Sequence, residues 1–548
     1  MMNSFPFPPS GCGPQFDLGE HHYEVWISRQ SLPVIGSDDT FVILTADQSA
    51  ENLSWLQAAY PGWRIVSASP ACLQGEFIRR FGTQMAEESA HQLARNTPAL
   101  SASTVVTPGQ CVAAAGVVAL VVLSLTAWPL ATCSALVALS SFAFVGGMLF
   151  RAFLAWAGGS DRGQTSSYEG GDEFLPVYTI LVPMYHEAEV LPRLVRSLLL
   201  LDYPRDKLDI KLIVEADDFD TARVADAMVG RGPFEVIRVP AGTPRTKPRA
   251  CNYAFKFARG ECTVIFDAED RPERDQLRKA VAMFRSCSRD VACLQARLSF
   301  YNAHENWLTR LFALDYALWF DILLPGLEKL RVPMPLGGTS NHFRTSVLRA
   351  FGAWDPFNVT EDADLGIRMA QLGKRVAMLD STTFEEAPTA LPAWLKQRSR
   401  WLKGYMQTWL VHMRNPRTLL ARSGWRGFCA FQLFLGGSVV AALVNPFLWL
   451  VFLLASAWPL PIFAALPEQA IAYSLVGLVS GNAIMIWLTL IAPWRRGWKG
   501  FAPYGFTVTL YWALISLAAY RGLWQLARRP FHWDKTVHGV SRLSRVPR

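Results

Sequence analysis

The sequence has few charged residues, and its cysteines do not follow the spacing of a known motif. Only 18% of its 548 residues are charged, fewer than in an average soluble protein. Its nine cysteines form no Cys-x-x-Cys pair and no Cys/His cluster at zinc spacing, so we expect reduced, mostly structural thiols. The first residues lack a basic start and an apolar run, so we expect no cleavable signal peptide. The scarcity of charge points instead to membrane segments.

The net charge of +8 is not gathered into one basic run with interleaved aromatic residues. Many of the basic residues instead flank two apolar blocks, at about 108–150 and 428–525. Lys and Arg beside apolar spans are typical of the cytosolic side of membrane proteins. We therefore expect a lipid bilayer as a partner and no nucleic acid.

Residues 1–105 predict a small cytosolic domain in which strands and helices alternate. The runs 41–46 and 63–69 indicate strands, and the runs 52–60 and 72–82 indicate helices. By this pattern the region resembles the N-terminal domain of type II secretion ATPases, which implies docking or regulation. Some relatives of that module bind cyclic diguanylate, but no Arg-Leu-Gly repeat is present here.

The first apolar block predicts a transmembrane hairpin over residues 108–150. The uncharged runs 108–128 and 131–150 are each long enough to cross a bilayer, and Pro129 separates them. Arginines on both sides of the block place both flanks in the cytosol. The segment from Gly158 to Asp172 has the composition of a linker.

The second apolar block, residues 428–526, predicts further spans over 428–458, 470–492 and 503–526. If Asn445-Pro446 breaks the first of these into a hairpin, the block has four spans. If 503–526 lies at the membrane interface, it has two. Both readings keep the basic tail, residues 527–548, in the cytosol.

Residues 174–390 predict an α/β domain in which strands alternate with crossover helices. Its β-rich runs are 177–185, 210–218, 234–240 and 262–270. Two of these runs end in acidic clusters. Ligands of open α/β sheets bind beyond the carboxyl ends of the strands, so we expect both clusters on one rim of one crevice.

The acidic clusters are candidate cation ligands. Asp267 and Glu269, two residues apart after a strand, have the form that holds Mg²⁺ or Mn²⁺ beside substrate phosphates. Asp217 and Asp218 follow another strand. An acidic loop is more often simply exposed to solvent. Asp267 and Glu269 become stronger candidates for cation ligands only because of the motifs that follow them in the sequence.

Taken in order, four motifs resemble the D, DxD, TED and QxxRW series of processive family 2 glycosyltransferases, which include cellulose, chitin and hyaluronan synthases. They are Asp217, Asp267-x-Glu269, Thr360-Glu361-Asp362 and Gln397-x-x-Arg400-Trp401. The resemblance covers about 175–410 and implies a cytosolic, Rossmann-like GT-A domain between membrane segments. One departure is Glu269, which stands where the family usually has Asp.

The resemblance also implies roles for these residues. Asp362, with Glu361 beside it, is the expected catalytic base, and a single base opposite the leaving group implies inversion. Asp267 and Glu269 are expected to bind the metal, Mg²⁺ or Mn²⁺. The expected substrate-binding residues are Asp217 and Asp218 at the uridine, Lys247 and Asn252 at the diphosphate, and Gln397, Arg400 and Trp401 at the diphosphate and the acceptor sugar.

Three further segments each allow two interpretations of their role. The QxxRW segment, 391–413, also predicts an amphipathic helix that anchors at lipid headgroups. Residues 335–344, with Gly337 and Gly338, lie where relatives hold the terminal acceptor sugar, although a plain turn fits nearly as well. Residues 532–539 resemble a gating segment, and equally a basic interfacial tail.

The leading hypothesis is a multi-pass synthase of the bacterial inner membrane that elongates and extrudes a β-linked polysaccharide, such as a β-glucan, from a UDP-sugar such as UDP-glucose. Periplasmic export partners fit that reading. The alternative is a nonprocessive enzyme that makes a glycolipid. The third reading is a degenerate domain that serves as a receptor or secretion scaffold, against which the intact motifs argue.

Overall fold

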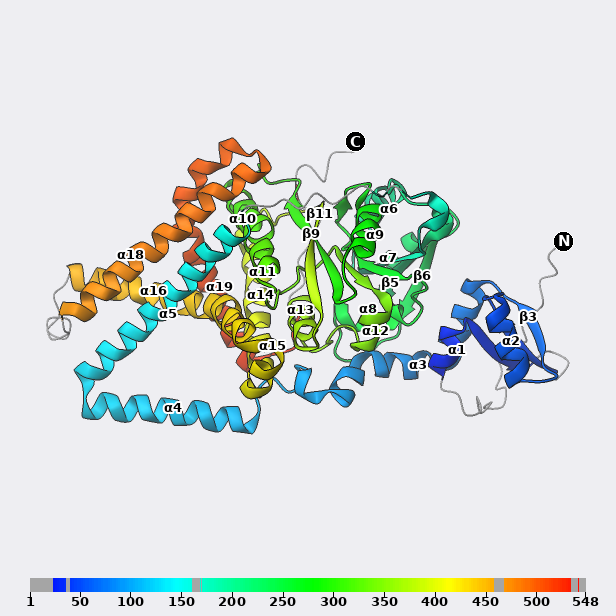
Figure 1. Cartoon of the computed structure of the whole chain (residues 1–548), viewed down its shortest axis with the longest axis horizontal. Coiled ribbons are helices and arrows are strands. Elements are labelled where there is room, and N and C mark those ends of the chain that lie inside the picture. Colours follow the sequence, from blue (N-terminus) through cyan, green and yellow to red (C-terminus); the bar gives the residue numbers. More distant parts are fainter. Residues whose placement is uncertain are drawn as a thin grey trace.

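A computed structural model describes residues 23–35, 40–159, 168, 170–457, 468–533 and 541. Figure 1 shows three regions along the long axis of the molecule. A small N-terminal unit lies at one end, the α/β domain lies in the middle, and long apolar helices lie at the other end. The helix α3 connects the first region to the second.

The N-terminal unit is a three-stranded sheet with helices. Strand β2 pairs antiparallel with β1 and parallel with β3. The predicted strands and the predicted helix at 52–60 are confirmed, while the helix predicted at 72–82 is the start of a much longer one. Its elements are α1 (Tyr23–Ser28), β1 (Ser31–Ile35), β2 (Phe41–Thr45), α2 (Ala50–Ala59), β3 (Arg64–Ser67), α3 (Pro70–Asn96) and the short η1 (Pro98–Leu100).

The central domain contains an eight-stranded sheet with the order β6-β5-β4-β7-β10-β9-β11-β8. The first four strands are parallel, as is the pair β9 and β11, whereas β10 runs antiparallel to both of its neighbours. The strands are β4 (Tyr178–Met184), β5 (Leu208–Glu215), β6 (Phe234–Val239), β7 (Cys262–Ile265), β8 (Arg271–Pro272), β9 (Val291–Phe300), β10 (Asn341–Arg344) and β11 (Arg375–Glu385).

Helices cover both faces of this sheet. All eight residues of β5 are buried, as expected of a central parallel strand between two helical layers. The four strands predicted from the sequence are confirmed within three residues at each end, except that β7 ends at Ile265, five residues before the predicted end. The helical segments are η2 (Asp172–Phe174), α6 (Leu191–Leu199), η3 (Arg205–Lys207), α7 (Phe219–Asp226), α8 (Lys247–Phe255), α9 (Gln276–Ser286), α10 (Trp307–Leu318), η4 (Trp319–Leu323), α11 (Leu324–Leu330), α12 (Thr345–Ala350) and α13 (Glu361–Gln371).

Among the described residues, five helical stretches are long and apolar enough to cross a membrane: 108–127, 129–157, 416–450, 474–496 and 500–528. The first two are α4 (Pro108–Ala127) and α5 (Pro129–Ala157), as predicted. They do not form a tight hairpin, because α4 diverges from α5 beyond their joint (Figure 1). No residue of α4 is buried, so protein contacts do not hold it against its neighbour.

The break predicted at Asn445-Pro446 is absent. Helix α16 (Gly437–Ala457) continues through Pro446, so this stretch is one span and the four-span reading is wrong. The helix before it bends elsewhere, at Gly424, where φ is +67°. The remaining helical segments here are α15 (Pro416–Phe431), η5 (Gln432–Gly436), α18 (Glu468–Ile491), η6 (Ala492–Arg496), η7 (Lys499–Thr507) and α19 (Val508–Arg528).

Helix α19 meets the central domain at both of its ends. Trp307 donates a hydrogen bond to Thr507 just before the helix, and Lys403 donates to the carbonyl of His532 just after it. The first of these contacts is to α10 and the second to α14 (Leu391–His412). Because 500–528 is also long and apolar enough to span a membrane, the interfacial position of 503–526 stays a prediction. Arg496 pairs with Asp321 of η4, so the basic turn before α19 also lies on the central domain's side.

The QxxRW segment forms α14 (Leu391–His412), a helix as predicted. It does not lie on the membrane surface throughout. Trp394 is fully buried and packs edge-on against Tyr511 of α19. Trp394 therefore packs α14 against α19, whereas Trp401 stacks on Tyr316 of α10 and Tyr405 stacks on Trp319 of η4.

Candidate active site

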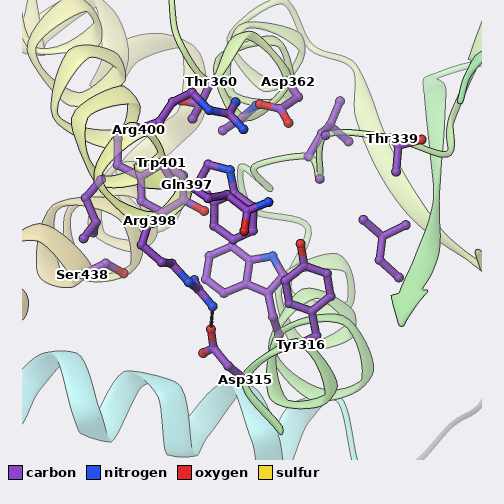
Figure 2. A pocket seen from close by; sticks show the side chains of 18 of the residues that line it. Asp315, Tyr316, Thr339, Thr360, Asp362, Gln397, Arg398, Arg400, Trp401 and Ser438 are labelled. Carbon is purple, nitrogen blue, oxygen red and sulfur yellow. Dashed lines mark hydrogen bonds and ion pairs between the residues drawn. The ribbon is translucent and has the colours of Figure 1, made fainter. Parts of the chain in front are cut away.

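A cavity of about 530 Å³ lies between the central domain and the apolar helices. One end is lined by residues that follow β7 and begin α13, and the side is formed by α14 (Figure 2). The other end is lined by residues of α5, α16, α18 and α19. Residues of the DxD, TED and QxxRW motifs therefore line one cavity, which continues among the apolar helices.

The loop after β7 brings Asp267 and Glu269 to the cavity. Asp267 pairs with Lys247, the first residue of α8, which also donates to the carbonyl oxygen of Gly338 at 2.8 Å. The backbone N–H of Asp267 donates to Asp270 at 2.7 Å, which fixes the turn. Two predicted metal ligands and the predicted phosphate-binding lysine thus lie together.

The charge of this loop fits a bound divalent cation. Burial and the neighbouring Asp267 and Glu269 raise the pKa of Asp270 well above its usual value, and one oxygen of its carboxyl has no partner. Burial and the same carboxylates raise the pKa of Glu385. No group of three or more His, Cys, Asp and Glu side chains in the described ranges has a metal-binding arrangement. Two carboxylates with substrate phosphates would suit Mg²⁺ or Mn²⁺.

Helix α13 places Glu361 and Asp362 in its first turn, where the helix dipole favours negative charge. Asp362 accepts a hydrogen bond from the backbone of Ala363 at 2.7 Å. A Cβ atom on Gly338 would lie 3.1 Å from the other Asp362 oxygen, so glycine leaves room for this carboxylate. Figure 2 shows Asp362 at the edge of the cavity, facing Gln397 and Arg400.

Burial raises the pKa of both carboxyl groups in this turn. For Glu361, burial and the nearby Asp362 raise the pKa to about 8. The pKa of Asp362 is raised by burial, with Lys247 and Arg400 acting in the opposite direction. The pair therefore holds a proton more tightly than a solvated carboxyl does, and it can exchange that proton near neutral pH.

The next carboxylate along α13 has a structural role. Asp364 is fully buried, and its two oxygens contact Arg368 at 2.8 Å and His412 of α14 at 2.9 Å. These partners lower its pKa despite burial. This cluster ties the helix of the TED motif to the helix of the QxxRW motif.

Arg400 and Gln397 face the cavity from α14. The Nε atom of Arg400 and the side-chain oxygen of Gln397 are buried and have no hydrogen-bond partner in the described structure. The guanidinium group of Arg400 lies 4.5 Å from the ring centroid of Trp533. Polar groups held in this way are suited to bind an oxygen-rich ligand.

Trp401 forms an aromatic wall of the cavity. Its ring stacks on Tyr316 with centroids 6.1 Å apart. Arg398, which the sequence analysis did not single out, pairs with Asp315 and lies 4.7 Å from the centroid of Trp401 (Figure 2). Arg398 occupies an unspecified position inside QxxRW, so its role depended on contacts with α10 that are distant in sequence.

Three predicted substrate-binding residues are not lining the cavity. The predicted diphosphate contact of Asn252 is wrong. Its side chain instead donates to the carbonyl of Trp354 at 2.8 Å and to the carbonyl of Ser89 in α3. Asp218 caps α7 by accepting from Thr221. Asp217 pairs with Arg245, and Arg245 itself lines the cavity.

The segment 335–344 contributes Gly337 and Gly338 to the lining of the cavity, and its contact with an acceptor sugar stays a prediction. Of the segment 532–539, only 532 and 533 are described, and the remainder lies outside the described residues. The same is true of most of the predicted linker at 158–172 and most of the tail at 527–548.

Comparison with known families identifies the class of this domain. Residues 176–404 match the model "Glycosyltransferase like family 2". Together with the mixed sheet and the strand-end carboxylates, this match defines a family 2 glycosyltransferase domain of the GT-A-like fold. The protein is a glycosyltransferase, with helices suited to a membrane on both sides of its catalytic domain.

Two curated relatives share the name beta-monoglucosyldiacylglycerol synthase. The Synechocystis protein is 27% identical over 377 residues, which are 67% of this chain and 76% of the relative. The Trichormus variabilis protein is 27% identical over 254 residues, which are 44% of this chain and about half, 52%, of the relative. A solved mannosyltransferase from Pyrobaculum calidifontis, in complex with GDP-Man and Mn²⁺, is 20% identical with a TM-score of 0.47, covering 72% of this chain and 99% of that one.

Proposed function

We propose that this protein transfers a hexosyl residue, glucose from UDP-glucose, to a diacylglycerol in the membrane with inversion at the anomeric carbon. The observation that carries this proposal is the cavity, which connects the TED carboxylates to side chains of four membrane-side helices. The names of the two curated relatives favour a lipid acceptor over the growing polysaccharide that the sequence analysis favoured. We place the protein in a bacterial inner membrane, with the catalytic domain in the cytosol.

The donor's diphosphate belongs beside the loop after β7. Asp267 and Glu269 would hold Mg²⁺ or Mn²⁺, which neutralises the phosphates of the leaving UDP when it is bound. Lys247 supplies a point charge at the same place, and Arg400 supplies a planar guanidinium from the opposite wall. Arg245, which pairs with Asp217, stands at the rim where the nucleoside would enter.

Asp362 is the general base in this proposal. It removes the proton from the acceptor hydroxyl while that oxygen attacks the anomeric carbon and UDP departs from the opposite face. The proton moves to the Asp362 carboxylate, whose affinity for it is increased by burial. Trp401 and its partner Tyr316 give the cavity a flat apolar wall against which a sugar ring can pack.

The test is incorporation of labelled sugar from a panel of UDP-sugars by the full-length protein in vesicles that contain diacylglycerol and Mg²⁺ or Mn²⁺. We expect label from UDP-glucose in the lipid extract, and about 10³-fold less with Asp362→Asn. Label in an ethanol-insoluble product would overturn the proposal in favour of a polysaccharide synthase. Absence of label from every donor would favour the scaffold reading.

A further inference from the structure

Residues 97–107 join α3 to α4, and we call them the connector. Figure 1 shows α3 and the connector running along one edge of the catalytic domain. Ser101 and Ala102, in the middle of the connector, are both 0% exposed. A segment that only joined two units would lie on the surface, with its polar backbone in contact with water. The burial therefore indicates a specific contact with the catalytic domain.

Asp355, five residues before Thr360 of the TED motif, makes this contact. Its carboxylate is 1% exposed and accepts hydrogen bonds from the Ser101 hydroxyl at 3.2 Å and from the backbone N–H of Ala102. Among the described residues, the remaining donor to this carboxylate is the backbone N–H of Phe357 at 3.1 Å. A buried carboxylate that lost these donors would be strongly unfavourable. The connector and the loop before the TED motif must therefore stay together.

The loop that begins at Asp355 is also held on its other side, by α14. The buried amide of Asn358 donates to the hydroxyl of Thr408 in α14 at 2.9 Å. The oxygen of the same amide accepts from the backbone N–H of Thr360 at 3.0 Å, where α13 starts. Because the whole loop is packed and hydrogen-bonded, a displacement of Asp355 would be passed on to Asp362 in the first turn of α13.

Asn252 ties the residue before Asp355 to two helices. Its amide oxygen accepts from the backbone N–H of Trp354 at 3.1 Å, and its amide nitrogen donates to the carbonyl of Trp354 at 2.8 Å. The same nitrogen donates to the carbonyl of Ser89 in α3 at 3.2 Å. Asn252 belongs to α8, the helix that begins with Lys247. Helix α3 and the connector therefore hold adjacent residues of the loop.

The connector also contacts the end of the QxxRW helix. Arg414 lies two residues beyond α14, and its guanidinium donates to the backbone carbonyls of four residues: Pro98, Ala99, Ser101 and Thr104. In the first turn of α4, Gln110 donates to the carbonyl of Leu410 in α14 at 2.8 Å. The connector thus bridges the loop before the TED motif and the helix of the QxxRW motif.

We propose that the connector positions the catalytic base. Asp355, held by Ser101 and Ala102, fixes the loop from which α13 starts and so fixes the carboxylate of Asp362. This inference rests on the role of base proposed above for Asp362. Asp355 and Asn252 are positioning residues, because neither lines the cavity and both act through the backbone before the TED motif. Since the connector joins the N-terminal unit to α4, it links both of them to the rate of transfer.

The first experiment measures steady-state transfer from UDP-glucose by the full-length protein in vesicles with diacylglycerol. Asp355→Asn keeps the size of the side chain, but its NH2 group cannot accept, so at least one of the three donors loses its acceptor. We expect kcat to fall about 10-fold, because a small displacement of a base is costly. The KM for UDP-glucose should stay within about 2-fold, since the donor site is unchanged.

A milder variant and its control use the connector itself. Ser101→Ala removes one donor to Asp355 and should lower kcat about 3-fold. Ser103→Ala is the matched control, because the Ser103 side chain makes no hydrogen bond among the described residues and only its backbone N–H donates, to Ser101. That variant should have the kcat of the wild type. If Asp355→Asn does not fold, Ser101→Ala carries the test.

The second experiment asks whether Asp355 acts through Asp362. In protein that already carries Asp362→Asn there is no base to position, so adding Asp355→Asn or Ser101→Ala should change the residual rate by less than about 2-fold. A variant that only reduced the amount of folded protein would lower the rate by the same factor in both backgrounds. The two roles are therefore distinguished by the comparison.

Three outcomes would overturn the inference. Asp355→Asn and Ser101→Ala could keep the kcat of the wild type, they could raise the KM for UDP-glucose as much as they lower kcat, or their effects could be equal in the two backgrounds. Failure of the proposed function differs from all three. In that case the wild type would label no lipid, or Asp362→Asn alone would remain fully active.

Discussion

The two ends of the cavity differ in how their charges are compensated. At the acidic end, Asp267 pairs with Lys247, and Glu361 and Asp362 lie within the field of Arg400. At the membrane end, Arg151 has only neutral oxygen partners in the described structure. The first arrangement suits a charged nucleotide and a proton transfer. In the second, Arg151 hydrogen-bonds only neutral oxygens, while Asp315 acts on it without a direct ion pair and the ring of Phe434 lies 5.9 Å from its guanidinium.

The largest expected effect separates chemistry from donor binding at the acidic end. Asp362→Asn removes the proposed base without changing the size of the side chain, so transfer should fall about 10³-fold. UDP binding should remain near its wild-type affinity, measured by calorimetry on the same preparation. Turnover close to that of the wild type would disprove the role of Asp362.

Arg400→Ala should act on the donor instead. Removing a charged hydrogen-bond donor to the diphosphate should weaken UDP binding about 10- to 100-fold. Arg400→Lys, which keeps the charge but not the planar fork, should recover part of that loss. If neither variant changes the affinity for UDP, Arg400 serves only to pack against Trp533.

Gly404→Ala tests the contact between α14 and the TED motif. A Cβ atom on Gly404 would lie 2.2 Å from the Thr360 hydroxyl oxygen, so the methyl group should displace the start of α13 and lower kcat about 10-fold. Gly75→Ala in α3 is the matched control, because nothing lies within 4 Å of a Cβ there. That variant should be as active as the wild type and slightly more stable. A fully active Gly404→Ala would mean that the motif tolerates the shift.

The smallest expected effect is a shift in pH dependence. The base must be ionised, so kcat/KM should fall as the pH drops through the apparent pKa of the Glu361 and Asp362 pair. Glu361→Gln removes the group whose pKa burial and Asp362 raise to about 8, so the acidic limb should then follow Asp362 alone and move to lower pH. The measurement is the pH profile of initial rates for both proteins. A shift to higher pH would contradict the proposed coupling.

The sequence by itself determined the elements whose signals are local. Buried β-rich runs predicted β4 to β7 because apolar, β-branched residues suit a strand between two layers, and uncharged stretches predicted α4, α5 and the later apolar helices. The order of the motifs also predicted that Asp267, Asp362 and Arg400 act together. Each of these inferences needed only neighbours in the chain or a fixed motif order.

Only the tertiary structure decided the contacts between distant segments. Asn252 follows the predicted lysine closely, yet the helical rotation of α8 turns it toward Ser89 and Trp354. Helix α16 continues through Pro446, and α19 contacts α10 just before its start and α14 just after its end. The membrane-side end of the cavity is lined by α5, which precedes the catalytic domain in the sequence, and by α16, α18 and α19, which follow it. Such contacts depend on packing between surfaces, which local sequence patterns do not encode.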